Sequence, residues 1–274
     1  MTPRIHLHIL ASGSKGNAAV VEGPCGSVLI DCGISRRSLL SRADELGVDM
    51  ERVQAVLLTH EHSDHVSGLS VFCNHFNGGI FATAGTLGAR KYLTELPATV
   101  IDHSDCLELC GMQVKVFPTS HDVADPIGFR FEVEGSGHAP DDAVGYCTDT
   151  GMLTDQAMTE LVGCRILALE SNHDENMLAT GPYPGYLKRR IASNKGHLSN
   201  DQAAAALQEL LTDDTEVVVG MHLSQENNRP SIAVRTLSKA VGAEAADSTF
   251  TEARTPDGHL SICVASQDAP ISLF

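Results

Sequence analysis

The chain has few aromatic residues and no apolar run long enough to cross a membrane. Trp is absent from its 274 residues and aromatic residues make up only 4%, so Leu, Ile, Val and Ala must supply the core. Hydrophobic residues still account for 42% of the chain, which is typical of a globular protein and not of a disordered one. No apolar stretch approaches the roughly 18 residues of a membrane helix. Residues 1–15 also lack an apolar run of signal-peptide length.

Paired cysteine motifs are missing as well. The chain has eight Cys, none of them in a C-x-x-C pair, and several lie in apolar, strand-like runs, as Cys147 and Cys164 do. This pattern favours reduced, structural thiols. Together with the missing signal peptide, it predicts a cytoplasmic protein that has no membrane partner.

Basic charge is scarce. The formal net charge is -16, and an acidic protein repels nucleic acid and anionic membranes at long range. A polyanionic substrate would therefore need a local basic patch or bound metal ions. The length suits one large domain, which we expect to span residues 1–274. The sequence does not indicate an oligomeric state.

Short apolar runs alternate with amphipathic stretches along the chain. The strand candidates are Ile5–Leu10, Ala18–Glu22, Ser27–Ile30, Ala55–Thr59, Val114–Pro118, Phe129–Val133, Val144–Cys147, Ile166–Glu170, Glu216–Gly220 and His259–Val264. The helix candidates are Ser38–Leu46, Ala84–Leu93, Thr154–Leu161, Ser199–Leu211 and Ile232–Val241, and Ser199 with Gln202 matches a capping box. A strand-rich first half and an alternating second half predict an α/β protein with two packed sheets and helices outside, a four-layer αββα sandwich.

Polar residues follow several of these strands. His60, His121, Asp149 and His222 each come at or just past the end of a predicted strand. Strand ends at one sheet edge are where α/β proteins assemble sites from distant parts of the chain. We therefore expect these side chains to meet in one site.

The densest group is the run His60-Glu61-His62-Ser63-Asp64-His65. Imidazole and carboxylate ligands favour Zn, Mn or Fe, and the absence of Cys argues against a purely structural zinc finger. His60 and His62 can point the same way on an extended segment, and Asp64 and His65 follow after a turn. The loop thus predicts two ligands for each of two divalent metal ions, with Zn favoured and Mn or Fe as alternatives.

This run resembles the T-H-x-H-x-D-H signature of the metallo-β-lactamase-fold hydrolases. Later residues resemble the family in order too: His121 in Ser120-His121-Asp122, Asp149 in Thr148-Asp149-Thr150-Gly151, and His222 before Leu223-Ser224. The segment Leu29-Ile30-Asp31-Cys32-Gly33 is similar to the family's second strand and turn. The resemblance implies that His60, His62 and His121 hold one metal, that Asp64, His65 and His222 hold the other, and that Asp149 bridges them. His6, His8 and the other remaining histidines do not fit this pattern, and we expect structural or surface roles for them.

A pair of divalent ions supplies a hydroxide at neutral pH and stabilises a developing oxyanion, which explains hydrolysis but leaves the substrate open. The segment 188–199 contains Lys188, Arg189, Arg190 and Lys195 and no acid. Such local basicity in an acidic chain suits a phosphate-binding surface, although a solvated face would look the same. The segment beginning Gly196-His197-Leu198-Ser199 resembles the part of RNase Z that carries a catalytic His. Glu170 stands where RNase Z has a Glu that orients that His.

The closest resemblance is to the WalJ (YycJ) group of exonucleases. It rests on Leu10-Ala11-Ser12-Gly13-Ser14-Lys15-Gly16-Asn17-Ala18, Glu170-Ser171-Asn172-His173-Asp174, Gly181-Pro182-Tyr183-Pro184, Gly196-His197-Leu198-Ser199-Asn200 and His222-Leu223-Ser224-Gln225-Glu226-Asn227-Asn228. It implies a two-metal phosphodiesterase that degrades DNA from a 5′ end, with catalytic roles for Asp64, His197 and Glu170. Ser12, Ser14, Lys15, Asn17 and Lys195 are the expected substrate-binding residues, and the loop at 12–17 could offer backbone N–H groups to a terminal phosphate; a plain turn is the alternative.

Other enzymes with the same metal loop remain alternatives. An RNA-processing enzyme or a hydrolase of small phosphodiesters would use the same residues, although DNA is favoured over RNA. A glyoxalase II-like thioesterase would leave the basic stretch at 188–199 unused, and a class B lactamase would need an export signal. A non-enzymatic scaffold of this fold would normally have lost ligands, whereas all seven positions are filled here.

Overall fold

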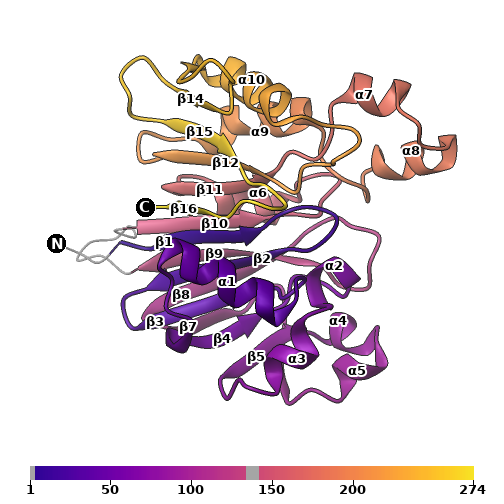
Figure 1. Ribbon diagram of the computed structural model, residues 1–274, viewed down its shortest axis with the longest axis vertical. Coiled ribbons are helices and arrows are strands. Elements are labelled where there is room, and N and C mark those ends of the chain that lie inside the picture. Colours follow the sequence, from indigo (N-terminus) through magenta and orange to yellow (C-terminus); the bar gives the residue numbers. More distant parts are fainter. Residues whose placement is uncertain (1–3, 134–141) are drawn as a thin grey trace. The chain divides into compact units, whose positions relative to one another are not determined.

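Strands and helices alternate along residues 4–133 and 142–274, the part of the chain that the computed structural model describes (Figure 1). The chain forms two units. Unit 1 comprises Met1–Pro118, Val123–Val144 and Gln267–Phe274, and unit 2 comprises Thr119–Asp122 and Gly145–Ser266. The expectation that residues 1–274 fold as one domain stays a prediction.

Unit 1 contains a seven-stranded mixed sheet in the order β16-β1-β2-β3-β4-β5-β6. Its strands are β1 (His6–Ala11), β2 (Ala18–Gly23), β3 (Gly26–Ile30), β4 (Val53–Leu57), β5 (Gly79–Thr83), β6 (Ala98–Ile101) and β16 (Ile271–Leu273). Strands β16, β1, β2 and β3 pair antiparallel, whereas β3, β4, β5 and β6 run parallel. The parallel pairing places Ile30 beside Leu57, so the loops after β3 and β4 leave the sheet at the same edge.

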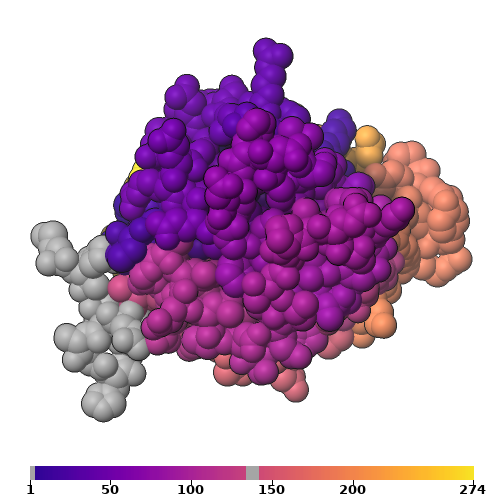
Figure 2. All heavy atoms as spheres, turned by 90° about the horizontal axis from the view of Figure 1, so that it is seen from below, coloured from indigo at the N-terminus to yellow at the C-terminus, as the bar shows by residue number. Residues whose placement is uncertain are grey.

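Short helices accompany this sheet. They are α1 (Arg36–Leu46), η1 (Met50–Arg52), α2 (Ser63–Val66), α3 (Leu69–Cys73), α4 (Ala84–Gly88) and α5 (Lys91–Thr94). Leu39 of α1 and Leu69 of α3 pack with Val20, Leu29 and Val56 of the sheet in one buried cluster. This burial of apolar side chains stabilises the sheet edge from which the loop with His60–His65 emerges. Figure 2 views unit 1 from the end at which α3, α4 and α5 lie in Figure 1.

A second group of strands in unit 1 is antiparallel. It consists of β7 (Cys106–Leu109), β8 (Met112–Pro118) and β9 (Ile127–Val133), with β7 paired to β8 and β8 paired to β9. Every residue of β9 is buried, and Phe117, Phe129 and Phe131 are completely so. Three of the chain's eight Phe side chains thus lie in the core beside these strands. Strand β10 (Asp142–Cys147) is divided between the units after Val144.

Unit 2 is built around parallel strands. Strands β11 (Ile166–Glu170), β12 (Val217–Met221) and β15 (Ser261–Val264) run parallel, and β14 (Glu252–Arg254) and β13 (Glu244–Ala245) extend them antiparallel. The helices are α6 (Asp155–Leu161), α7 (Glu175–Thr180), α8 (Gly185–Ile191), α9 (Asn200–Leu210) and α10 (Pro230–Val241). Because Glu170 pairs with Met221 at the carboxyl ends of β11 and β12, the residues that follow both strands lie side by side.

Most predicted elements are confirmed, including the capping box of Ser199 and Gln202 at the start of α9. The single helix predicted over Ala84–Leu93 is wrong, because α4 ends at Gly88 and α5 begins at Lys91. Between them Arg90 adopts an extended conformation, and its Nε donates to the Glu61 carbonyl at 2.7 Å. That bond to the metal loop replaces the helical continuation that the periodicity indicated.

All eight cysteines are free thiols, as the sequence predicts. Burial raises the pKa of the Cys32 and Cys263 thiols to about 12 in each case, which suppresses their reactivity. Within residues 4–133 and 142–274, every helix is too short or too polar to cross a lipid bilayer.

Candidate metal centre

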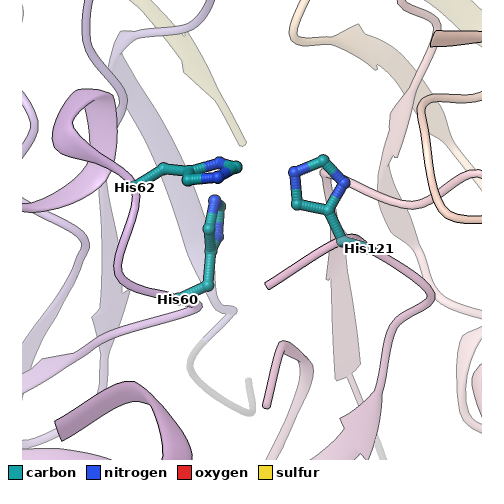
Figure 3. Close-up of side chains that lie close together, drawn as sticks. All are labelled: His60, His62 and His121. Atoms are coloured by element: carbon teal, nitrogen blue, oxygen red, sulfur yellow. The ribbon is translucent and has the colours of Figure 1, made fainter. Parts of the chain in front are cut away.

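The predicted metal ligands are divided between the units: His60, His62, Asp64 and His65 lie in unit 1, and His121, Asp149 and His222 lie in unit 2. In unit 1 the chain leaves β4 and reaches His60 and His65, which are both fully buried. The rings of His60 and His62 are 4.8 Å apart and nearly perpendicular (Figure 3). The His65 ring centroid lies 4.0 Å from that of His60, so one loop gathers three imidazoles.

Asp31 orients this loop. Its Oδ2 accepts a hydrogen bond from His65 Nδ1 at 2.7 Å. Its Oδ1 and Oδ2 also accept hydrogen bonds from the amide and the hydroxyl of Thr59, respectively, each at 2.8 Å. A carboxylate that binds one imidazole nitrogen fixes the tautomer and leaves the other nitrogen for a metal. The role of Asp31 was not predicted from the sequence. Its signal was the position of a lone carboxylate directly after the apolar strand β3.

Close backbone approach brings the Asp31 turn to the metal loop. A Cβ at Gly33 would lie 1.6 Å from the Asp64 carbonyl oxygen, so only glycine fits there. The Cys32 amide donates to the His65 carbonyl at 2.8 Å, and the Asn17 amide donates to the Asp64 carbonyl at 2.7 Å. These bonds fix the backbone of the last two ligands in this unit.

The predicted substrate-binding loop also lies in unit 1, and the structure narrows its role. The amides of Gly13, Lys15 and Gly16 donate to Asn17 Oδ1, Gln267 Oε1 and the Gly13 carbonyl, respectively. These N–H groups are therefore used within the protein and are not presented to a phosphate. Asn17 and Ser12 are buried, and Asn17 Nδ2 lies 3.0 Å from His65 Nε2. Ser14 and Lys15 are exposed, as is Lys195 in unit 2.

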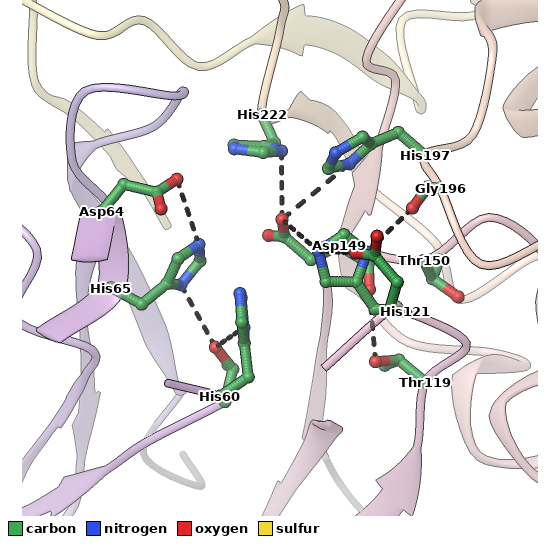
Figure 4. Close-up of polar contacts among 12 residues, drawn as sticks. His60, Asp64, His65, Thr119, His121, Asp149, Thr150, Gly196, His197 and His222 are labelled. Carbon is green, nitrogen blue, oxygen red and sulfur yellow. Dashed lines mark hydrogen bonds and ion pairs between the residues drawn. The ribbon is translucent and has the colours of Figure 1, made fainter. Parts of the chain in front are cut away.

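In unit 2 the site is centred on the buried carboxylate of Asp149. Its Oδ1 lies 3.5 Å from His222 Nδ1, 3.8 Å from His197 Nδ1 and 3.8 Å from His121 Nε2. Figure 4 shows His222 and His197 both turned toward this carboxylate. Unit 2 thus brings together three predicted ligands, His121, Asp149 and His222, with the predicted catalytic residue His197.

Glu170 lies behind these groups at the end of β11 and is completely buried. Its Oε1 accepts from His197 Nδ1 at 2.8 Å and from His222 Nδ1 at 3.1 Å, and its Oε2 accepts the Thr150 amide at 2.8 Å. Burial alone would raise the pKa of Glu170, but the charge and hydrogen bond of His197 and the hydrogen bond of His222 lower it to about 2. An ionised carboxylate only accepts hydrogen bonds, so the Nδ1 atoms of His197 and His222 both carry a proton, which directs Nε2 of His222 toward a metal.

His121 is held by backbone. Its Nδ1 donates to the Gly196 carbonyl at 3.0 Å, which again leaves Nε2 as the metal donor. A Cβ at Gly196 would lie 2.0 Å from the Ile191 carbonyl oxygen, so this approach requires glycine. A cavity of about 180 Å³ opens beside His121 and His197 and is also lined by Asp122, Tyr183, Leu187, Arg190, Ile191 and Gly196.

A buried amide network supports the loop that carries His222. Asn172 Nδ2 donates to the His222 carbonyl at 2.8 Å. Asn228 Nδ2 donates to the Ser171 and Asn172 carbonyls at 2.9 and 3.0 Å, and Asn200 Nδ2 donates to Asn228 Oδ1 at 3.1 Å. These residues were expected only as points of resemblance. The structure gives them a positioning role.

Three site residues adopt a left-handed backbone. The φ angles of Asp31, Asp149 and His222 are 57°, 54° and 55°. Asp and His visit this region more readily than most residues, but each such position carries strain. All three lie just past the ends of strands β3, β10 and β12.

The donor set fits divalent metal ions. Unit 1 offers three imidazoles and the Asp64 carboxylate, and unit 2 offers Asp149, His121 and His222. Asp31, Gly196 and Glu170 occupy the second nitrogen of His65, His121 and His222. Ligating histidines in metalloproteins are oriented in this way, and mixed nitrogen and oxygen ligands are those that Zn, Mn and Fe accept.

Comparison with known proteins agrees with this chemistry. The family profile described as "Beta-lactamase superfamily domain" matches residues 27–223. The chain is 32% identical over 241 residues to the exodeoxyribonuclease YycJ of Bacillus anthracis, a match that covers 86% of this chain and 89% of the relative. It is also 32% identical over 235 residues to the exodeoxyribonuclease WalJ of Streptococcus pneumoniae, covering 84% of this chain and 85% of the relative.

Solved structures share the fold. The metallo-β-lactamase fold protein YhfI from Bacillus subtilis superimposes with a TM-score of 0.66 at 15% identity, over 98% of this chain and 99% of the other. The predicted α/β class, the metallo-β-lactamase fold, is confirmed. The chain therefore belongs to the β-lactamase superfamily and is a metal-dependent hydrolase of the metallo-β-lactamase fold.

Proposed function

We propose that the protein is a two-metal phosphodiesterase that degrades DNA as a 5′-to-3′ exonuclease. The observation that carries the proposal is the pair of Glu170 and His197 beside Asp149. A buried, ionised carboxylate holds His197 at 2.8 Å, while 19% of the His197 side chain is exposed. When protonated, an imidazole that a carboxylate orients suits protonation of a leaving oxygen. The names of the two relatives, both exodeoxyribonucleases, support DNA as the substrate.

We further propose that the predicted ligands of both units act together. His60, His62 and His121 would hold the first ion, and Asp64, His65 and His222 would hold the second, with Asp149 shared between them. Zn is favoured, and Mn and Fe have suitable ligand chemistry too. When bound, the two ions would supply a nucleophilic water at neutral pH and offset the negative charge that builds on the phosphoryl oxygens.

The chain's own residues then move the protons. As the oxygen of water forms its bond to phosphorus, the Asp64 carboxylate accepts the proton that the water loses. The bond from phosphorus to the leaving oxygen breaks, and His197 gives the proton of its Nε2 to that oxygen. Glu170 stabilises the imidazolium before transfer and keeps the proton on Nδ1 afterwards, since its Oε1 lies 2.8 Å from that atom.

Substrate contact is assigned to a basic surface on unit 2, which we define as Tyr186, Arg189 and Lys195. All three are exposed, Tyr186 by 69%. An aromatic face beside cations suits single-stranded nucleic acid, where bases stack and phosphates pair with charge. In unit 1, the exposed Ser14 and Lys15 side chains are the proposed contacts for a terminal phosphate. Such a substrate places the proposed enzyme in the cytoplasm.

The proposal is tested with one set of labelled substrates. DNA carrying a 5′-phosphate should be hydrolysed faster than the same strand with a 5′-hydroxyl, and faster than RNA of the same sequence. Nitrocefin and S-lactoylglutathione, a lactam and a thioester, should remain intact. Preference for RNA would redirect the proposal to RNA processing, and turnover of the thioester would overturn it.

Asp64→Ala is the sharpest variant for this assay. Loss of a metal ligand that also accepts the proton of water should abolish metal-dependent hydrolysis of DNA. The Asp64 side chain is 20% exposed and the N-cap of α2 is His62, so circular dichroism should show that the variant still folds. Nuclease activity equal to that of the parent chain would contradict the assignment.

A further inference from the structure

We propose that unit 1 carries a separate zinc site on its sheet, formed by His6, His8 and Glu22 and called here the strand site. Strands β1 and β2 pair antiparallel with His6 directly opposite Glu22. His6 and His8 are two residues apart on β1, so their side chains emerge on the same face of the sheet. Three metal-ligand side chains thus converge on one patch.

The distances suit a tetrahedral ion. Glu22 Oε2 lies 3.5 Å from His8 Nε2 and 3.9 Å from His6 Nδ1, and one ligand atom from each residue lies within 4.8 Å of the others. In a tetrahedral zinc site with bonds of about 2.0–2.1 Å, neighbouring ligand atoms are about 3.3 Å apart. Small side-chain rotations would therefore gather the three ligands around one ion.

His8 is prepared for this role. Only 4% of its side chain is exposed, its Nδ1 lies 2.7 Å from Ser272 Oγ on β16, and its Nε2 makes no hydrogen bond to any residue in the described ranges. A hydrogen bond at one imidazole nitrogen directs the other toward a metal.

The other two ligands are also oriented. Glu22 Oε1 accepts from Arg52 Nη1 at 2.5 Å, which fixes the carboxylate and leaves Oε2 facing the histidines. The His6 side chain is 34% exposed, so solvent can reach the site and supply a water as the fourth ligand. The Phe274 ring lies against His6 and His8, with centroids 5.1 and 6.1 Å away, and shields one side of the patch.

A bound ion would join β1 to β2 directly and to β16 through Ser272. All of these elements belong to the seven-stranded sheet of unit 1, and none of the three ligands comes from the candidate metal centre. The simpler reading of the cluster is a histidine–carboxylate ion pair. An ion pair would bind no metal, whereas the strand site would bind one Zn²⁺ per chain. The number of bound metal ions therefore distinguishes the two interpretations.

The test compares metal binding by the full chain and four variants. Each metal-free protein is titrated with Zn²⁺ against a chromophoric chelator, and Co²⁺ absorption reports tetrahedral coordination. His8→Gln and Glu22→Gln should each bind one ion fewer than the parent chain, and His6→Gln should weaken that ion at least tenfold. His75→Gln is the matched control, because His75 is an exposed histidine of the same unit.

Equal stoichiometry in the parent chain, His8→Gln and Glu22→Gln would overturn the strand site. If His8→Gln fails to fold, His6→Gln gives the decision, since His6 is partly exposed and its replacement should be tolerated. DNA hydrolysis should be unchanged in His6→Gln. Asp64→Ala should still fill the strand site, so failure of the proposed nuclease function and failure of this proposal give different results.

Discussion

Two buried carboxylates, Asp31 and Glu170, do the same work in different units. Each follows or ends a strand that runs parallel to its neighbour, and each holds the Nδ1 of a histidine in the candidate centre. Glu170 also holds His197, so one carboxylate orients a proposed metal ligand and the proposed acid. Both groups are fully buried, and burial of a carboxylate is costly unless hydrogen bonds replace its lost hydration.

His197→Ala tests the proposed acid at the level of one residue. The variant should keep its metal content, while the rate of DNA hydrolysis falls by roughly 10²–10⁴, the usual contribution of a general acid. Metal content is measured by elemental analysis and the rate by release of labelled nucleotides. His259→Ala, at an exposed histidine of unit 2, should behave as the parent chain. Loss of metal from His197→Ala would make His197 a ligand instead.

Helix α8 and the loop after it present charge on the surface of unit 2. Two of its cations are already engaged: Arg190 pairs with Asp122 at 2.5 Å, and Lys188 donates to the Ala179 carbonyl at 2.7 Å. Arg189 and Lys195 are exposed, which makes them the best candidates for phosphate contacts. In the basic segment 188–199, two cations therefore make contacts within the protein, and the other two are candidates for binding phosphate.

The double variant Arg189→Gln/Lys195→Gln should weaken DNA binding at low salt. Each lost phosphate contact lowers the slope of log K against log salt by about 0.7 for single strands and about 0.9 for duplex. Fluorescence anisotropy of labelled DNA across a salt series measures this slope. Lys239→Gln removes an exposed cation from α10 as the control. A parent-like slope in the double variant would rule out this surface.

Strand β9 carries a buried charge cluster that should respond to pH. Burial alone would raise the pKa of Glu132, but hydrogen bonds from Lys115 and Arg130 and their charges outweigh it and lower the pKa below 4.5. A lowered folded-state pKa contributes stability above the unfolded-state value, and that stability is lost as pH falls through the folded-state value. Glu132→Gln should therefore reduce the unfolding free energy by about 1–3 kcal/mol near neutral pH.

At acid pH, the difference in unfolding free energy between Glu132→Gln and the parent chain should become smaller. Urea unfolding near pH 7 and at a series of pH values below about 4 measures these free energies. Glu209→Gln, at an exposed position of α9, should leave them unchanged. A constant deficit at all of these pH values would assign the loss to packing instead of charge.

The sequence predicted the strands and the longer helices better than the short helices. Strands such as β4 and β11 have four apolar residues in five, α9 begins with a capping box, and α9 and α10 both have apolar faces. Helices α7 and α8 have one buried residue and none, respectively, so no hydrophobic periodicity marks them. The proposed ligands His60, His62, Asp64 and His65 were predicted because their motif is local, and the other proposed ligands because each comes at or just past the end of a predicted strand, in the order of the family resemblance. The contact of Asp31 with His65 and the contact of Glu170 with His222 were not predicted, because they join residues that are distant in sequence.

At the scale of the whole molecule, bound cations matter because the net charge is -16. Carboxylates and imidazoles gathered in the candidate centre repel or desolvate one another until a cation joins them. Metal binding to the native state adds to the free energy of unfolding. Chelation should therefore abolish DNA hydrolysis and lower the midpoint of thermal unfolding, and added Zn²⁺ or Mn²⁺ should restore both.

Calorimetry and the nuclease assay, each with and without chelator, make this measurement. Full hydrolysis in the metal-depleted protein would exclude metal ions from the reaction. A restored melting temperature without restored hydrolysis would show that the added ion fits the centre but is the wrong one for the reaction.

The left-handed backbone at Asp31, Asp149 and His222 also bears on how an inert enzyme could be made for capturing its substrate. At these positions, replacement by Ala would strain the left-handed backbone and would also remove the functional side chain. A loss of activity in such a variant could therefore have either cause. Asn keeps the shape of Asp and tolerates a φ near 54°, the value at Asp149. Asp149→Asn is thus the replacement that keeps the turn while it withdraws a carboxylate, and it is the natural starting point for trapping DNA in the site.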